Sequence, residues 1–104
     1  MPDSKKQKIL IVDDEAFLVK LIMRIFEKYN FEINAFENPL KALEEIEKIN
    51  PDVIILDIRM PQMSGIDFTR NIRMNPKFKF TPIALITAFM NDESDVIEGL
   101  KSGA

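Results

Sequence analysis

Three aspartates follow the two most apolar runs of the sequence. Asp13 and Asp14 come directly after residues 9–12, and Asp57 comes directly after residues 53–56. Such short, unbroken, β-branched runs are typical of strands buried on both faces of a parallel sheet. If the two strands are neighbours, the three carboxylates meet, and two such charges at about 4 Å repel by about 4 kcal/mol at an effective dielectric of about 20. We therefore expect protons or a hard divalent cation, Mg²⁺ above all, to compensate them.

The composition restricts any chemistry to carboxylates, hydroxyls and amines. The 104 residues include no cysteine and no histidine, which excludes disulfides, thiolate or histidine zinc sites and Ser–His catalysis. The net charge is −3 without a sustained basic stripe, which predicts no direct binding of nucleic acid by this segment. The sequence contains neither a signal-peptide core nor an apolar stretch of about 20 residues, so we expect a cytoplasmic protein without membrane contact.

The apolar pattern alternates between the periods of strands and helices. In chain order it predicts strand 9–12, helix 17–29, strand 31–36, helix 39–49, strand 53–56, helix 65–75, strand 82–87 and a helix from about 91 to 100. This alternation implies an α/β fold with a parallel sheet and right-handed crossovers. Because a (β/α)₈ barrel needs about 250 residues, we predict an open, doubly wound parallel sheet. Ligands of such sheets bind outside the carboxyl ends of the strands, where the aspartates lie.

The three aspartates also allow a simpler interpretation. An acidic pair after a strand, or a single aspartate there, is also common in solvated turns. The presence of acids after both buried-type strands of one sheet favours the functional interpretation. No glycine-rich loop follows a strand, so neither a dinucleotide fingerprint nor a P-loop is predicted.

The segments ILIVDDE, DVIILDIRMPQMSGIDF and PIALITA resemble the receiver domain of two-component response regulators, from about Lys8 to Ala104. The resemblance implies a flavodoxin-like sheet of order 2-1-3-4 and a role in phosphorelay signal transduction. It implies that Asp57 accepts a phosphoryl group from the phosphohistidine of a histidine kinase or histidine phosphotransfer protein, which switches the domain's partner interactions. A receiver is a signalling domain, not an enzyme with an external substrate, since it catalyses only its own phosphotransfer and dephosphorylation.

The same resemblance implies roles for the residues around the acceptor. Mg²⁺ would be bound by Asp14, Asp57 and the backbone carbonyl of Arg59, with Asp13 acting through a metal-bound water. The remaining roles are phosphoryl binding and switching by Thr87 and Ala88, tuning of the phosphoryl lifetime by Arg59 and Phe89, and shaping of the loop after Asp57 by Pro61 and Gly65.

The family pattern continues beyond what this sequence contains. Its fifth strand carries an aromatic switch residue and ends in a Lys-Pro pair, and Lys101 does not match that lysine. We therefore expect residues 1–104 to form one receiver domain with a flexible tail at 1–7 and without the final strand and helix. The sequence is then a fragment, a truncation completed by a partner or a swapped element, or a stable four-stranded receiver. An unpaired strand 82–87 would favour self-association or swapping.

Three alternative functions remain beside phosphotransfer. The missing lysine allows a degenerate receiver that binds partners independently of phosphorylation. A Mg²⁺ phosphohydrolase of the haloacid-dehalogenase type is disfavoured because Arg59 stands where that class has a second acid. A flavin-binding flavodoxin is disfavoured because the residues DDEAF after the first strand do not form a phosphate-binding loop.

Phe17 and Leu21 are expected in the core, with contact to a kinase or phosphotransfer partner as the alternative.

Overall fold

The computed structural model describes residues 6–86 of the chain. Its elements are β1 (Gln7–Val12), α1 (Ala16–Phe26), β2 (Phe31–Phe36), α2 (Pro39–Ile49), β3 (Val53–Asp57), α3 (Gly65–Arg73), the 3₁₀ turn η1 (Pro76–Phe78) and β4 (Ile83–Ile86). Strand β1 begins at the last residue of the predicted tail. The predicted helix from residue 91 and the predicted site residues Thr87, Ala88 and Phe89 lie outside the described residues.

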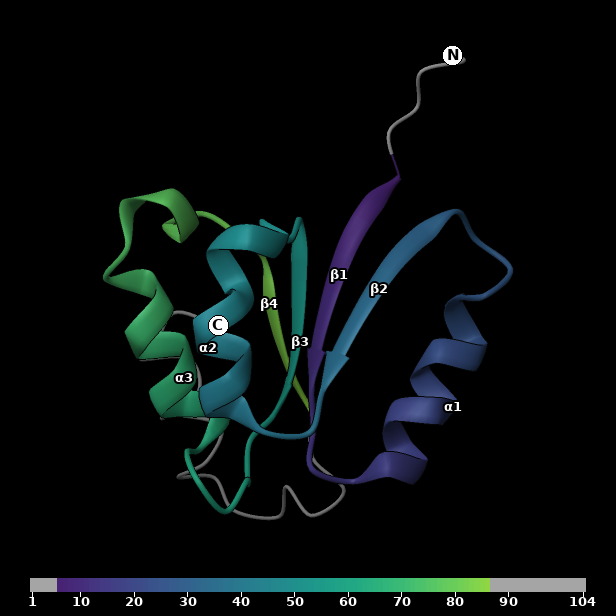
Figure 1. Cartoon of the computed structure of the whole chain (residues 1–104), viewed down its shortest axis with the longest axis horizontal. Helices are drawn as coiled ribbons and strands as arrows, with labels where there is room; N and C mark the ends of the chain where they lie inside the picture. The colour runs from purple at the N-terminus through teal and green to yellow at the C-terminus, as the bar shows by residue number, and fades with distance from the viewer. Residues whose placement is uncertain (1–5, 87–104) are drawn as a thin grey trace.

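The four strands form one parallel sheet of order β2-β1-β3-β4, which confirms the predicted fold class and strand order. Helix α1 covers one face of the sheet, and helices α2 and α3 cover the other (Figure 1). The register pairs Val12 with Leu56, so the carboxyl ends of β1 and β3 are adjacent. Within the described residues, no helix is both long and apolar enough to span a bilayer.

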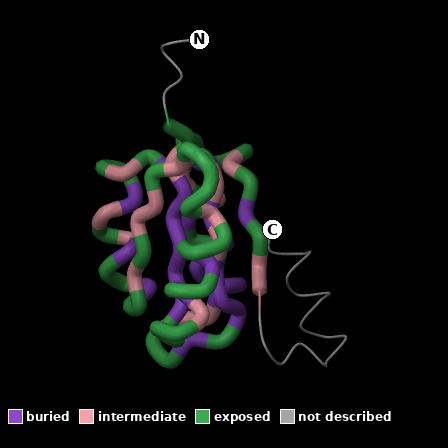
Figure 2. Tube along the Cα trace, turned by 90° about the vertical axis from the view of Figure 1, so that its right-hand side faces the viewer, coloured by how far each residue is buried: buried purple, intermediate pink, exposed green. Residues whose placement is uncertain are grey.

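The core consists of two apolar layers, one on each face of the sheet. Residues of the central strands such as Leu10 and Ile54 pack under α2 and α3, whereas Ile9 and Ile11 pack under α1. Buried positions follow the central strands, and the helices turn their exposed sides outward (Figure 2). Because β1 is buried on both faces, its C-terminal residues are held rigidly, and so is the acidic pair that follows.

The helix starts are set by short polar side chains. The Asn38 side chain accepts a hydrogen bond from the backbone N–H of Leu40 at 2.9 Å, with Pro39 in the first helical turn. Ser64 caps α3 in the same way by accepting from the backbone N–H of Asp67 at 3.0 Å. These caps satisfy backbone donors that no helical carbonyl can reach. The cap at Ser64 fixes the point where the chain turns from the loop after β3 into α3.

The expectation that Phe17 and Leu21 belong to the core is wrong. Their side chains are 78% and 44% exposed, and Ile25, one turn further along α1, is 56% exposed. The side of α1 that faces the sheet carries Val19 and Ile22 instead. A helix buries only a stripe toward its sheet, and α1 is apolar over more than that stripe. Phe17, Leu21 and Ile25 therefore form an exposed apolar row, which we call the α1 ridge.

Candidate functional site

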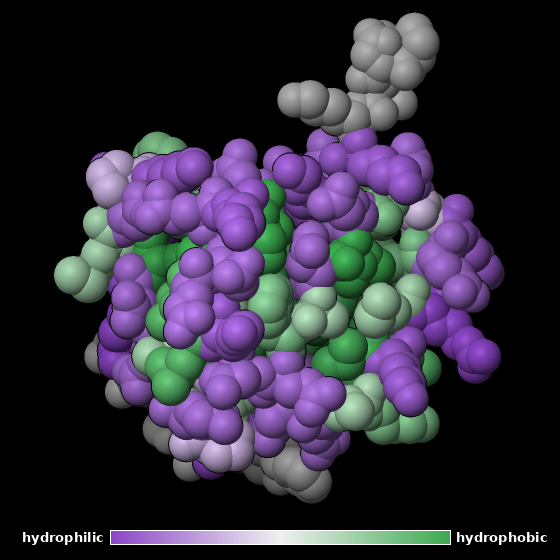
Figure 3. Space-filling model, in the orientation of Figure 1, coloured by the Kyte–Doolittle hydropathy of each residue, from purple (hydrophilic) through white to green (hydrophobic). Residues whose placement is uncertain are grey.

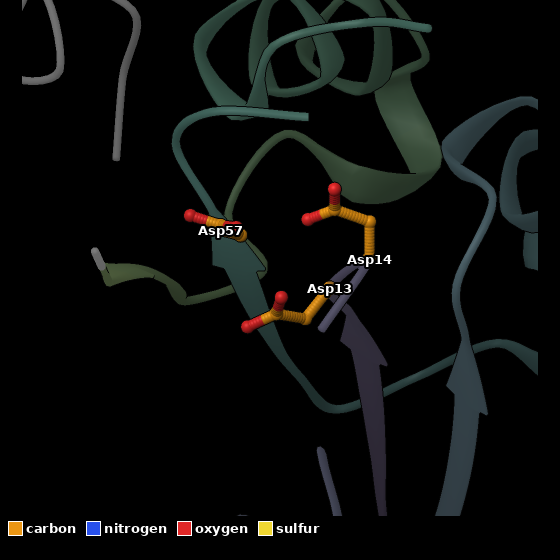
Figure 4. Close-up of side chains that lie close together, drawn as sticks. All are labelled: Asp13, Asp14 and Asp57. Carbon is orange, nitrogen blue, oxygen red and sulfur yellow. The ribbon is translucent and has the colours of Figure 1, made fainter. Parts of the chain in front are cut away.

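Three carboxylates meet at the carboxyl edge of the sheet. Asp13 directly follows β1, Asp14 is the next residue, and Asp57 is the last residue of β3. One oxygen from each carboxylate lies within 4.8 Å of the others. The three side chains lie close together at the ends of the two strands (Figure 4). The structure thus brings together the three acids that the sequence singles out.

Two hydrogen bonds, one of the backbone and one of the carboxylate, fix the position of Asp13. Its N–H donates to the Phe36 carbonyl oxygen at 3.1 Å, which ties the end of β1 to the end of β2. Its Oδ1 accepts from the N–H of Glu15 at 2.9 Å. The other oxygen, Oδ2, is buried and has no hydrogen-bond partner among residues 6–86. A buried acceptor without a partner is costly, so this atom is poised to meet a proton or a cation.

Asp57 is only 8% exposed, and its environment disfavours its charge. Burial, together with the nearby carboxylates of Asp13 and Asp14, raises the pKa of Asp57 from 3.8 to about 7. The N–H of Arg59, which donates to Oδ1 of Asp57 at 3.2 Å, acts in the opposite direction. Burial also raises the pKa of Asp13. A bound proton or a bound cation therefore stabilises the cluster.

The donor set fits a hard divalent cation. It consists of carboxylate oxygens alone, which is the set that Mg²⁺ prefers over softer metals. Asp14 is exposed, so a cation with several of its waters can approach from solvent, whereas Oδ2 of Asp13 is buried and lacks a partner among the described residues. The acidic residues of the site therefore fit the predicted Mg²⁺.

Gly65 positions the loop that leaves Asp57. Its N–H donates to the Ile58 carbonyl oxygen at 2.8 Å, which folds the start of α3 back onto the end of β3. A Cβ at position 65 would overlap the carbonyl oxygen of Asp57 and lie 3.0 Å from its carbonyl carbon. Thr69, fully buried, donates its hydroxyl to the Gly65 carbonyl oxygen at 2.8 Å. Only glycine fits this close approach of helix and strand.

The loop between β3 and α3 also carries Arg59 and Pro61. Both are exposed, and with Asp14, Met60 and Ser64 they line a cavity of about 490 Å³ beside the cluster. The sequence prediction placed Arg59 and Pro61 in this loop, but it missed Ser64 and Thr69, which support Gly65. The Ser-x-x-Asp pattern of residues 64–67 is a helix-start signal that identifies Ser64. No local signal distinguishes Thr69 from other helical threonines.

Comparison with known proteins places the chain in one family. A family model described as "Response regulator receiver domain" matches residues 9–104. The DNA-binding response regulator MtrA of Mycobacterium tuberculosis is 34% identical over 102 residues, which are 98% of this chain and 43% of MtrA. The chemotaxis protein CheY of Thermotoga maritima is 33% identical over 100 residues, which are 94% of this chain and 80% of CheY.

A solved structure agrees with these sequence relatives. The chemotaxis response regulator CheY4 of Vibrio cholerae has a TM-score of 0.87 and 31% identity, and the match covers 96% of this chain and 82% of CheY4. The chain spans about two fifths of the length of MtrA. The order of the sheet, the acids at its carboxyl edge and the family match over nearly the whole sequence lead to one conclusion: this chain belongs to the response regulator receiver domain family of two-component signalling.

Proposed function

We propose that this receiver domain accepts a phosphoryl group on Asp57 from a phosphohistidine, with Mg²⁺ bound at the acidic cluster. The observation that carries this proposal is the convergence of the Asp13, Asp14 and Asp57 carboxylates at the carboxyl edge of the sheet. Asp57 is proposed as the acceptor because it ends the strand β3 directly before Ile58 and Arg59, which line the cavity together with Asp14. Asp14, Asp57 and the backbone carbonyl of Arg59 then bind the cation directly, and Asp13 acts through a metal-bound water.

The proposed reaction is an in-line transfer between two nucleophiles. A carboxylate oxygen of Asp57 attacks the phosphorus atom, an O–P bond forms, and the P–N bond to the donor histidine breaks. The electron pair of that bond returns to the imidazole nitrogen, which takes a proton from water. A bound Mg²⁺ supplies positive charge that offsets the carboxylates and the incoming phosphoryl group.

The chain's own residues prepare Asp57 for this attack. The Arg59 N–H holds Oδ1 of Asp57 in place, and Gly65 keeps the loop close to the strand end. A carboxylate attacks only when it is ionised, and the raised pKa of Asp57 means that a cation or another positive group must favour this form. The aspartyl phosphate carries more negative charge than the carboxylate, by about one unit. This change is the signal that would alter the domain's partner interactions, with Thr87 and Ala88 responding to it.

The donor is proposed to be a protein that docks on the α1 ridge. Phe17 begins the ridge three residues after Asp14, so a partner seated there reaches the acidic cluster. Lys20 and Arg24 flank the ridge on the same helix and are exposed. An apolar row beside cations fits a helical surface with an apolar stripe and acidic flanks. A histidine kinase or histidine phosphotransfer protein of this chemistry is the proposed partner, and a cytoplasmic location stays a prediction.

Intact mass spectrometry tests the acceptor. The domain is incubated with Mg²⁺ and a small phosphodonor such as phosphoramidate, and we expect a mass gain of one phosphoryl group. The gain should disappear in Asp57→Asn and persist in Asp67→Asn, which removes an exposed carboxylate on α3. A folded sample that binds Mg²⁺ but gains no mass contradicts the proposal and supports a phosphorylation-independent binding module. Sustained release of phosphate from many phosphomonoesters would instead indicate a phosphohydrolase.

A second comparison tests the docking surface. Phe17→Glu should slow transfer from a phosphorylated histidine phosphotransfer protein and leave labelling by phosphoramidate unchanged. Phe80→Glu is the matched control, because Phe80 is 86% exposed but lies before β4, at the opposite edge of the sheet. Equal effects of the two substitutions on protein-mediated transfer would exclude the α1 ridge as the docking surface.

A further inference from the structure

A groove runs along the seam between α1 and β2. It encloses about 710 Å³, more than the cavity beside the carboxylates, and its walls include Lys20, Met23 and Arg24 of α1 and Phe31 and Ile33 of β2. Hydrophobic surface gathers over β2 and toward α1 in the space-filling view, with hydrophilic residues around it (Figure 3). The groove lies along the C-terminal half of α1 and the N-terminal half of β2, away from the cluster of Asp13, Asp14 and Asp57.

The floor of the groove is a packed set of aromatic rings. The rings of Phe26 and Phe31 meet edge to face, with centroids 5.3 Å apart and an interplanar angle of 87°. Tyr29 approaches Phe31 at 6.1 Å between centroids and is 61% exposed. Rings in such pairs hold one another in place. The groove is therefore preorganised, and an occupant would not need to order its floor.

The walls of the groove carry an excess of positive charge. Lys6, Lys20 and Arg24 line it, against a single acid, Glu27. None of these three cations forms an ion pair with a residue of the part that the structure describes. The chain as a whole has a net charge of −3, so this is a basic surface on an acidic protein. Charge complementarity therefore favours an acidic occupant.

One side of the groove is a strand edge that has no neighbouring strand within residues 6–86. Strand β2 is the outermost strand of the described sheet on its side, next to β1 alone. The Phe36 carbonyl oxygen accepts from Asp13 and so points toward β1. Because the backbone groups of successive residues in a strand point to opposite sides, those of Ile33 and Ala35 point outward. An outward row of free N–H and C=O groups is a template for an added strand.

We propose that this groove binds an extended acidic segment of another protein, which adds to β2 as a further parallel or antiparallel strand. The added backbone pairs with Ile33 and Ala35, and its inward side chains reach the groove. Acidic side chains meet Lys20 and Arg24, and apolar ones pack on the aromatic floor. An occupant leaves Asp57 and the first turn of α1 uncovered, but it shares Lys20 and Arg24 with the docking surface proposed for the phosphodonor.

Fluorescence anisotropy with defined peptides tests this inference. The probe is a fluorescein-labelled ten-residue peptide that alternates glutamate with valine, and the comparison peptide replaces each glutamate by lysine. We expect the acidic peptide to bind at least about tenfold more tightly. The double variant Lys20→Glu/Arg24→Glu should weaken its binding by about tenfold or more. The matched control is Lys41→Glu/Lys48→Glu, which reverses two exposed charges on α2 and should leave binding unchanged.

A proline substitution separates strand addition from charge attraction alone. Ala35 is exposed at the sheet edge, so Ala35→Pro removes an outward N–H and leaves the pairing with β1 intact. Thermal unfolding and far-ultraviolet circular dichroism confirm that the variant is folded. We expect it to bind the acidic peptide about tenfold or more weakly. The proposal is overturned if Ala35→Pro binds the acidic peptide as tightly as the wild type. It is also overturned if Lys41→Glu/Lys48→Glu weakens binding as much as Lys20→Glu/Arg24→Glu does. Concentration-dependent dimerisation that Ala35→Pro abolishes, without binding of the peptide, would assign the edge to a second copy and also overturn it.

Discussion

Replacing Asp57 by asparagine should stabilise the metal-free domain at alkaline pH. The substitution removes a negative charge from a cluster of three carboxylates, two of which are buried, while keeping nearly the same shape. The amide oxygen of asparagine can still accept from the Arg59 N–H, as Oδ1 of Asp57 does now. The variant thus loses the repulsion and the burial cost of the charge, and the Arg59 N–H keeps its acceptor.

The pKa of Asp57 sets the sign and the size of this effect. The value is about 7 in the folded protein against an ordinary value of 3.8. The folded protein therefore holds more protons than the unfolded chain in this range, and its free energy of unfolding falls as the pH rises from 3.8 through 7. At about 1.4 kcal/mol for each pKa unit, the upper limit of the loss is about 4 kcal/mol. We expect about 2 kcal/mol at pH values above 7, since solvent and counterions reach the exposed Asp14 and screen the cluster.

Urea unfolding in the presence of a chelator measures this difference. Above pH 7, Asp57→Asn should be more stable than the wild type by about 2 kcal/mol. Below pH 4 the gain should vanish, because the wild-type carboxyl is then protonated. Asp67→Asn, at an exposed position on α3, controls for the loss of one charge. A gain that is equal at both pH values, or a loss of stability above pH 7, would refute the reasoning from buried charge.

Three further predictions concern the site and the edge of the sheet. Asp14→Ala should weaken Mg²⁺ binding in calorimetric titration more than Asp13→Ala, and equal or reversed losses would contradict the assigned roles. Gly65→Ala should destabilise the domain by about 2 kcal/mol, because its Cβ would overlap the backbone at the end of β3, whereas Ser64→Ala should cost about 1 kcal/mol through the lost cap. We expect the domain to self-associate through the outer edge of β4, and Ala84→Lys should reduce this association in light scattering. A wild-type domain that stays monomeric at every concentration would count against this edge.

The architecture was predictable because two kinds of local signal agree. The β-branched runs at 9–12 and 53–56 can be buried on both faces only inside a parallel sheet, and the helical period between them requires crossovers. Aspartates that end those strands must then share one edge. The proximity of Asp13, Asp14 and Asp57 follows from topology and needs no knowledge of side-chain packing.

The parts that could not be predicted depend on contacts between elements. The apolar residues of α1 occupy more of its circumference than the sheet can cover, so the period alone could not show that Val19 faces the sheet and Phe17 faces outward. The four-residue apolar period continues to Tyr29, so the sequence predicts a longer helix than α1, which ends at Phe26. Burial raises the pKa of Asp57 and leaves Oδ2 of Asp13 without a partner among the described residues, and the sequence does not show how deeply either side chain is buried.

Chemical trapping of the phosphorylated residue tests the central claim most directly. The domain is labelled with phosphoramidate and Mg²⁺, reduced with borohydride, which converts an acyl phosphate to an alcohol, and mapped by peptide mass spectrometry. The account predicts homoserine at position 57 and an unmodified aspartate at positions 13 and 14. Homoserine at position 13 or 14 in place of 57, or at none of the three in a folded sample that binds Mg²⁺, would contradict the assignment of Asp57 as the phosphoacceptor.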